Sequence, residues 1–244
     1  MRNKITKLNA SYNGSPIYQS RCYKLPSAIL VKKIEAEAKN YFEKASGCHD
    51  WTHVERVRNL ALAIGKKEKA DLGILEIAAL LHDICKSDEL KCRGKFCHAE
   101  KGAALAQRIL KKHGVDGDMI KRVAHCIVAH RYRNNYRPET IEAKVLSDAD
   151  KLDAIGAVGI ARDFVAAGFI GTPVLYTGTE KKLARSNEKH SYSDADTAIL
   201  EYEVKLKHLK NIMFTCEGRR IGKKRHKFME KFFKRFWEEV AGKK

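Results

Sequence analysis

A histidine and an aspartate, His82 and Asp83, stand side by side at the end of the apolar segment 74–84. The composition of this segment predicts a buried helix, and a charged side chain at a buried position is costly unless something pairs with it. A metal ion is the partner that suits both groups, because imidazole nitrogen and carboxylate oxygen both bind divalent metals. The pair therefore predicts a metal centre on a helical scaffold.

Two other segments carry matching ligands. His53 lies in the string HDWTH, and Asp150 lies in the string DADKLDA. Each falls in a separate predicted helix, so four side chains from three helices can converge on one ion. Two imidazoles and two carboxylates suit Mn, Fe, Co, Ni or Zn better than Mg alone. Four protein ligands leave positions for water and a phosphate oxygen, and a metal lowers the pKa of bound water from about 15.7 towards about 7. The pattern therefore favours a hydrolytic site.

The helices that must position these residues follow from apolar residues at helical spacing, bounded by glycines and capping residues. We expect them at residues 27–46, 50–65, 74–84, 98–113, 119–130, 140–155, 158–167, 195–214 and 223–240, which makes the fold class all-α, a helical bundle. Residues 86–95 and 168–193 are predicted loops, and a loop as long as the second is usually functional or mobile. The aromatic stripe of the last helix is expected to pack in the core.

The second helix has two candidate start signals. Thr52 and Glu55 have the spacing of a capping box. The dipeptide His49-Asp50 precedes the helix, so we expect Asp50 to cap the helix rather than to bind a metal.

Length and composition indicate one helical domain with basic ends. The chain has 244 residues, of which 44% are hydrophobic, enough to bury a sizeable core. Residues 1–26 show no sustained period and are expected to form a flexible basic tail, whereas residues 27–244 form the domain with a C-terminal helical extension. The net charge of +18 attracts polyanions such as nucleotides or nucleic acid. The basic excess is uneven, with 7 basic and no acidic residues in 1–34 and 14 basic against 4 acidic residues in 205–244.

The seven cysteines are odd in number and irregularly spaced, in a chain large enough to fold without disulfides. They are expected to be reduced thiols of a cytoplasmic protein. A structural zinc site is not expected at Cys85, Cys92, Cys97 and His98, because their spacing is loose and no second cysteine pair accompanies them. No stretch approaches about 18 apolar residues, so we expect no membrane span. The oligomeric state is left open.

Four strings in this order resemble one family. HDWTHVERV, AALLHDI, DADKLDAIGAVGIAR and GRRIGKKRHKFMEKFFKRF are similar to segments of a bacterial subgroup of the HD-domain phosphohydrolase superfamily, whose pattern is H…HD…D. The resemblance covers residues 27–240. It implies an all-α fold, metal ligands at His53, His82, Asp83 and Asp150, and hydrolysis of phosphate esters or anhydrides. Asp148 is the rival for the last ligand, on another helical face. Some members of the subgroup cleave nucleoside triphosphates to monophosphate and pyrophosphate, which implies a (d)NTP or related nucleotide as substrate.

The same resemblance implies a divalent metal cofactor, for which we expect Mn, with Fe, Co, Ni, Zn or Mg as alternatives. Asp83, Lys86 and Asp153 are grouped as catalytic. Lys86 stands where related hydrolases often carry an acid, with Asp88 and Glu89 following later, and Asp153 is placed to orient a metal ligand. The residues expected to bind substrate phosphate are His98, His130, Arg131, Lys151 and Arg162.

Two alternatives stay open. The string HDICK is similar to the HDIGK of cyclic-dinucleotide phosphodiesterases, which carry additional histidines, and His98, His125 and His130 lie at suitable places. A second metal bridged by Asp83 would favour a phosphodiesterase acting on cyclic dinucleotides or RNA. The other alternative is a non-catalytic basic protein that binds nucleic acid, but the last helix carries no base-stacking aromatics among its charges, which is typical of a solvated face. We therefore expect a nucleotide or another phosphorylated small molecule as the partner.

Overall fold

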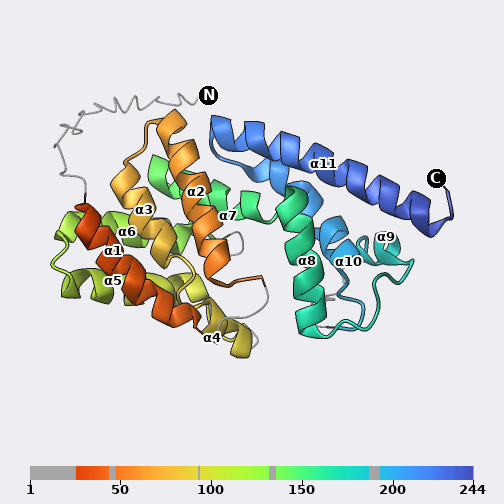
Figure 1. Cartoon of the computed structure of the whole chain (residues 1–244), viewed down its shortest axis with the longest axis horizontal. Coiled ribbons are helices and arrows are strands. Elements are labelled where there is room, and N and C mark those ends of the chain that lie inside the picture. Colours follow the sequence, from red (N-terminus) through yellow and green to blue (C-terminus); the bar gives the residue numbers. More distant parts are fainter. Residues whose placement is uncertain (1–25, 44–47, 93, 132–135, 187–192, 244) are drawn as a thin grey trace, which may run out of the picture.

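The described part of the chain is built from helices alone (Figure 1). The computed structural model describes residues 26–43, 48–92, 94–131, 136–186 and 193–243. No strand occurs in these ranges, so the all-α prediction is confirmed for them. The predicted tail falls outside them, apart from Pro26.

The helices vary from one turn to seven. In chain order they are α1 (Ala28–Lys39), η1 (Asn40–Phe42), α2 (Trp51–Glu68), α3 (Leu72–Leu81), α4 (Lys86–Lys91), α5 (His98–Lys112), α6 (Gly117–Ala129), α7 (Ile141–Asp153), α8 (Gly156–Ile170), α9 (Glu180–Leu183), α10 (Ala198–Val204), η2 (Leu206–Ile212) and α11 (Cys216–Val240), where η marks a 3-10 helix. None of the described helices is both long and apolar enough to cross a membrane. The cysteines of the described ranges are free thiols.

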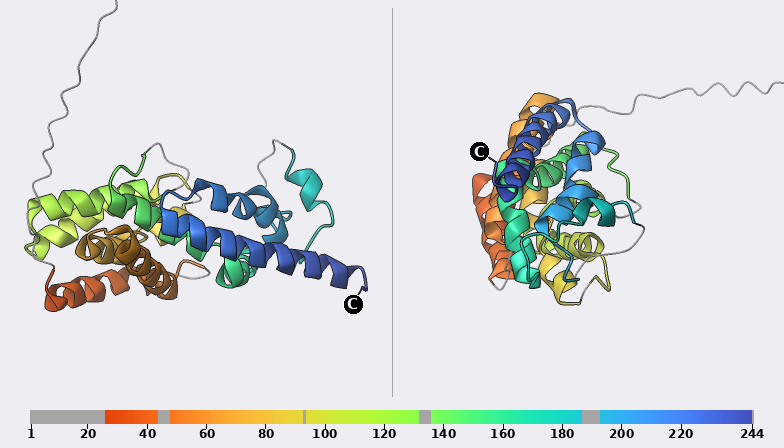
Figure 2. Two further views of the ribbon diagram at one scale, coloured as in Figure 1. Left: turned by 90° about the horizontal axis from the view of Figure 1, so that it is seen from above. Right: turned by 90° about the vertical axis from the view of Figure 1, so that its right-hand side faces the viewer.

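A bundle of α1, α2, α3, α5, α6 and α7 holds most of the core. At its centre, α3 buries every residue between 73 and 81 except Glu76. It packs against α2, α6 and α7, while α5 covers α6. From the bundle α7 leads into α8, and α11 runs along one side of the elongated molecule, where it packs on α7, α8 and η2 (Figure 2). Because α2, α3 and α7 are neighbours, residues at their ends can meet.

Several boundaries differ from the predictions. The segment 86–95, predicted as a loop, contains α4, and the single helix predicted at 195–214 is two shorter helices, α10 and η2. The predicted helix at 27–46 ends at Lys39 and continues as η1, and the predicted loop 168–193 contains the end of α8 and α9.

The last helix begins at Cys216 rather than at 223. Its N-cap is Thr215, whose hydroxyl accepts a hydrogen bond from Gly218 N at 2.9 Å. Gly218 looks like a helix breaker in the sequence, but here it permits close packing, because a Cβ at this position would overlap the Asp148 carboxylate of α7.

The start of α2 confirms one prediction and contradicts another. Asp50 is the N-cap and accepts a hydrogen bond from His53 N at 3.2 Å, as expected. The capping box is wrong, because the Thr52 hydroxyl donates to Asp50 and Glu55 accepts from Trp51 Nε1. Because Asp50 caps the helix, Thr52 is not the N-cap.

Candidate metal centre

Three helix ends bring the four expected metal ligands together. His53 lies in the first turn of α2, His82 and Asp83 follow α3, and Asp150 lies in the last turn of α7. His53 Nε2 is 3.2 Å from His82 Nε2 and 3.5 Å from Asp83 Oδ2. The same nitrogen is 3.6 Å from Asp150 Oδ1. The first three side chains are buried, whereas Asp150 is 27% exposed and leaves the cluster open on one side.

The two imidazoles of this cluster turn their Nε2 atoms toward each other. His53 Nδ1 lies 2.8 Å from Asp153 Oδ2, and His82 Nδ1 lies 2.8 Å from the Ala79 carbonyl oxygen. Both oxygens can only accept, so each Nδ1 carries a proton, and Nε2 keeps its lone pair when the ring is neutral. Burial alone would lower the pKa of His53, but the hydrogen bonds to Asp153 and Asp83 outweigh it and raise the pKa, so a metal ion would compete with a proton for His53 Nε2. Burial lowers the pKa of His82 to about 4, so this ring stays neutral at neutral pH. Two lone pairs and two carboxylates around one point fit a divalent cation.

A second cluster shares Asp83 with the first. Its Oδ1 atom is 3.1 Å from His98 Nε2 and 3.6 Å from His130 Nε2, and these two nitrogens are 3.3 Å apart. Each Nδ1 donates away from the cluster, to Glu89 from His98 and to the Ile127 carbonyl from His130. Burial alone would lower the pKa of His98, but Asp83 and Glu89 outweigh it and raise the pKa to about 9. This second cluster can hold a proton or a cation.

Glu89 lies in the site, although in the sequence it comes later after the His-Asp pair than the acid of related hydrolases. Because α4 forms, its side chain turns inward and is buried. Glu89 Oε2 accepts from Lys86 Nζ and His98 Nδ1, both at 2.8 Å, and Oε1 pairs with Arg131 at 2.7 Å. Asp88, the other candidate, is half exposed and pairs with Lys101. Glu89 therefore holds Lys86, which was expected to be catalytic, and His98 and Arg131, which were expected to bind substrate phosphate.

His49 was not expected in the site. Its Nδ1 lies 3.1 Å from Asp83 Oδ2, and its ring packs edge-on against His53 with centroids 5.3 Å apart. Burial lowers the pKa of His49 to about 3. Only Asp50 of this dipeptide was considered from the sequence, although the four-residue spacing from His49 to His53 is the signal that places both rings together.

Asp153 lies behind His53 and does not reach the cavity. Its carboxylate accepts from His53 Nδ1, from Arg56 Nε at 2.8 Å and from Arg162 at 2.7 Å. The remaining guanidinium contacts of Arg162 go to the Cys48 carbonyl. Asp153 therefore has the geometry of a residue that orients His53. Arg162 already donates to Asp153 and to the Cys48 carbonyl, so it has hydrogen-bond partners without a substrate phosphate.

Lys151 adjoins the cluster on the inner side of α7. Its ammonium donates to the Ser147 hydroxyl and carbonyl and, at 3.4 Å, to the His130 carbonyl. Burial lowers its pKa. These contacts tie α6 to α7, while the side chain still borders the cavity.

Two residues considered from the sequence lie elsewhere. Asp148 faces α11, where it accepts from Phe214 N and Thr215 N at 2.8 Å each. It is therefore no competitor for Asp150. His125 accepts from Glu139 N at the surface, so it does not join the histidine clusters.

A cavity of about 350 Å³ opens from the clusters toward α8, α10 and η2. Of the expected site residues it is lined by Asp83, Lys86, His98, His130, Arg131, Asp150, Lys151 and Arg162. Its far wall mixes apolar and charged side chains. The larger apolar residues are Phe169, Ile170, Leu206 and Leu209, and the charged ones are Asp163, Asp196, Glu201 and Lys205. Burial, followed by the charge of Glu201, raises the pKa of Asp163 to about 8. The apolar part of this wall suits a flat apolar group.

Comparison with known proteins identifies the family. The sequence pattern of the HD domain matches residues 50–155. The protein YpgQ of Bacillus subtilis is 36% identical over 204 residues, which are 82% of this chain and 88% of YpgQ. The chain belongs to the HD domain superfamily. This HD-domain protein is therefore a phosphohydrolase. Among the described residues, three His/Asp clusters, each with ligand atoms within 4.8 Å of one another, are consistent with divalent metal binding.

Solved structures of HD-domain proteins share the fold. The crystal structure of YpgQ in complex with ADP has a TM-score of 0.66 at 32% identity, over 87% of this chain and 98% of that one. An HD-superfamily hydrolase from Bacillus thuringiensis has a TM-score of 0.64 at 29% identity, over 86% of this chain and 96% of that one. Ribonuclease Y of Treponema denticola is 30% identical over 187 residues, which are 70% of this chain but 34% of ribonuclease Y.

Proposed function

We propose that this chain hydrolyses ribo- or deoxyribonucleoside triphosphates to the monophosphate and pyrophosphate, with a divalent metal for which we favour Mn. The observation that carries the proposal is the cavity, in which the histidine and carboxylate cluster and several cations lie opposite a wall with an apolar part, formed by Phe169, Ile170, Leu206 and Leu209. The ionic end suits a triphosphate and the apolar part of the wall suits a base. The similarity to YpgQ, which has been crystallised with ADP, supports a nucleotide substrate.

In this proposal His53, His82, Asp83 and Asp150 hold the metal. When bound there, a divalent ion lowers the pKa of a coordinated water and polarises the phosphate. Asp150 is the ligand that borders the cavity with the largest exposure, so the phosphate approaches on its side. Asp153 keeps the His53 Nδ1 proton in place, which leaves Nε2 free as a ligand.

The phosphate charge is met by cations on the cavity wall. Lys86 and Arg131 are both held by Glu89 and keep further N–H donors for a phosphate. His98 and His130 border the same space and can donate or bind the second cation. Such preorganised donors stabilise developing charge, which is the largest contribution the protein can make to phosphoryl transfer.

The second cluster favours one other function. Asp83 lies between two pairs of histidines, so two metals bridged by this carboxylate would form the clamp of a phosphodiesterase. Such an enzyme would act on cyclic dinucleotides or RNA. Metal content separates the two functions, because the triphosphate hydrolase needs one ion per chain and the phosphodiesterase needs two.

The test is hydrolysis by metal-stripped protein reloaded with Mn, against (d)NTPs, nucleoside diphosphates, cyclic dinucleotides and RNA. Ion chromatography should detect pyrophosphate and monophosphate from the triphosphates. Release of orthophosphate, or turnover of diesters alone, would contradict the proposal. Asp83→Ala should lose both metal and hydrolysis, while Asp88→Ala, a neighbouring exposed acid, should keep both.

A further inference from the structure

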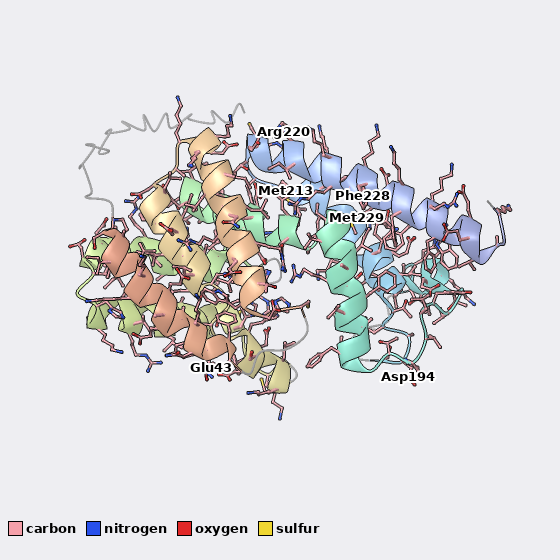
Figure 3. The ribbon with its side chains drawn as sticks, in the orientation of Figure 1. Glu43, Asp194, Met213, Arg220, Phe228 and Met229 are labelled. Atoms are coloured by element: carbon pink, nitrogen blue, oxygen red, sulfur yellow. The ribbon has the colours of Figure 1, made fainter. Side chains whose placement is uncertain are left out.

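A surface at the end of α2 and along the adjoining helix α11 carries seven exposed lysines. We call it the basic ridge and define it as Lys66, Lys67, Lys69, Lys223, Lys224, Lys227 and Lys231. The N-terminal end of α11, marked by Arg220 in Figure 3, adjoins the end of α2. Glu217 N donates to Glu68 Oε1 at 2.7 Å across this junction.

Lysines of α2 and lysines of α11 both lie close enough to Glu217 to affect its charge. The pKa of Glu217 is lowered first by its hydrogen bond to Arg220 and further by the charges of both Lys67 and Lys224. The charges of α2 and α11 therefore add at the junction.

The ridge lysines are not neutralised by ion pairs. Lys39 of α1, by contrast, pairs with Glu35 one turn away at 2.9 Å. None of the seven ridge lysines has an ion pair with an acid of the described residues, and the acid nearest in sequence to Lys231, Glu230, pairs with His226. Lysines at four-residue spacing along α11 repel one another and destabilise the helix.

The opposite side of α11 is already occupied. Gly222, Met229 and Phe233 are buried against the domain, so this apolar face is not available to enter a membrane. The ridge is also separate from the catalytic cavity, because no residue of α2 or α11 lines that cavity. The charge of the ridge is thus available to a large external polyanion.

We propose that the basic ridge binds the phosphodiester backbone of a nucleic acid without reading its sequence. At about 1.5 Å per residue, Lys223 to Lys231 covers about 12 Å of helix. One strand of duplex DNA presents a phosphate about every 3.4 Å along its axis, so several phosphates lie within reach of these side chains. The sequence predicted no base-stacking aromatic among the charges of this helix, but Phe228 is 49% exposed there. Because the lysines far outnumber this one ring, contacts to the backbone should dominate over base stacking.

The test compares two triple variants of the full chain with equal charge. Lys223→Glu, Lys227→Glu and Lys231→Glu together remove the centre of the ridge. Lys33→Glu, Lys111→Glu and Lys121→Glu are the matched control, on exposed positions of α1, α5 and α6. Binding of a fluorescent 20-base-pair DNA duplex is measured by anisotropy between 50 and 200 mM salt. Each lost phosphate contact lowers the slope of log K against log salt by about 0.9.

The ridge variant should bind at least tenfold more weakly, with a slope smaller by about three, while the control changes affinity less than threefold. Equal weakening in both variants, or no binding by the unaltered protein at 50 mM salt, would overturn the proposal. So would binding to phosphatidylserine vesicles without binding to nucleic acid. An RNA duplex and an RNA single strand show which form binds best. If the glutamate variant does not fold, the three glutamine substitutions replace it, and unchanged affinity there also refutes the ridge.

Discussion

Asp153→Asn should weaken metal binding although Asp153 does not touch the metal position. The substitution keeps the shape of the side chain but removes the carboxylate that accepts from His53 Nδ1 at 2.8 Å and from Arg56 and Arg162 at 2.8 and 2.7 Å. An amide can present its NH2 group to Nδ1, which moves the ring proton of His53 to Nε2 and blocks the ligand atom. Loss of such an orienting partner typically costs 10–100-fold in metal affinity, or about 1.4–2.7 kcal/mol.

Calorimetric titration of metal-stripped protein with Mn measures this change directly. Asp148→Asn is the matched control, since Asp148 is an equally buried aspartate of the same helix that faces α11. The control should lose stability but keep its metal affinity. If Asp153→Asn binds metal as tightly as the unaltered chain, or if only Asp148→Asn loses it, then the assignment of His53 as a ligand oriented by Asp153 is wrong.

Three further predictions concern the phosphate site, the acid at the far wall and the packing of α11. Lys86→Ala should raise KM for a triphosphate about tenfold, the value of one charged hydrogen bond, with metal content unchanged; loss of metal would indicate a structural role. In the folded chain Asp163 stays protonated up to about pH 8, whereas in the unfolded chain it ionises above its ordinary pKa of 3.8. The folded state therefore binds the extra proton between these values, and the free energy of unfolding falls as the pH rises from about 4 to 8. Asp163→Asn should therefore stabilise the chain more at pH 8 than at pH 5, by at most about 1.4 kcal/mol per pH unit in urea unfolding, and an equal effect at both values would refute the shift. Gly218→Ala should cost about 1–3 kcal/mol in the same assay, because its Cβ overlaps Asp148, whereas Gly117→Ala, with open space around it, should cost less.

The order and type of the ligands were predictable because ionisable residues stand out within segments whose apolar composition predicts burial. A histidine and an aspartate at the end of α3 have no reason to be buried without a cation, and the same holds for His53 in the first turn of α2. The bundle fold follows from helical periodicity in the same way. The roles of these side chains as ligands stay a prediction that metal binding tests.

Other parts of the site depend on turns that local sequence does not determine. Glu89 enters the site only because residues 86–91 form a helix in a segment rich in polar residues, and His49 enters only because the chain before α2 folds back over Asp83. The start of α11 was missed for the converse reason, since the glycines that suggest a break allow close contact with α7.

The sequence by itself determined the all-helical class, the basic ends and most of the residues able to bind a metal, because periodicity, charge and residue type are local properties. Only the tertiary structure decided that Asp83 stands between two histidine pairs, that Asp153 supports His53 from behind, and that lysines of α2 and α11 share one surface. These relations join residues far apart in the chain, and their distances are set by how the helices pack rather than by any pattern within one helix.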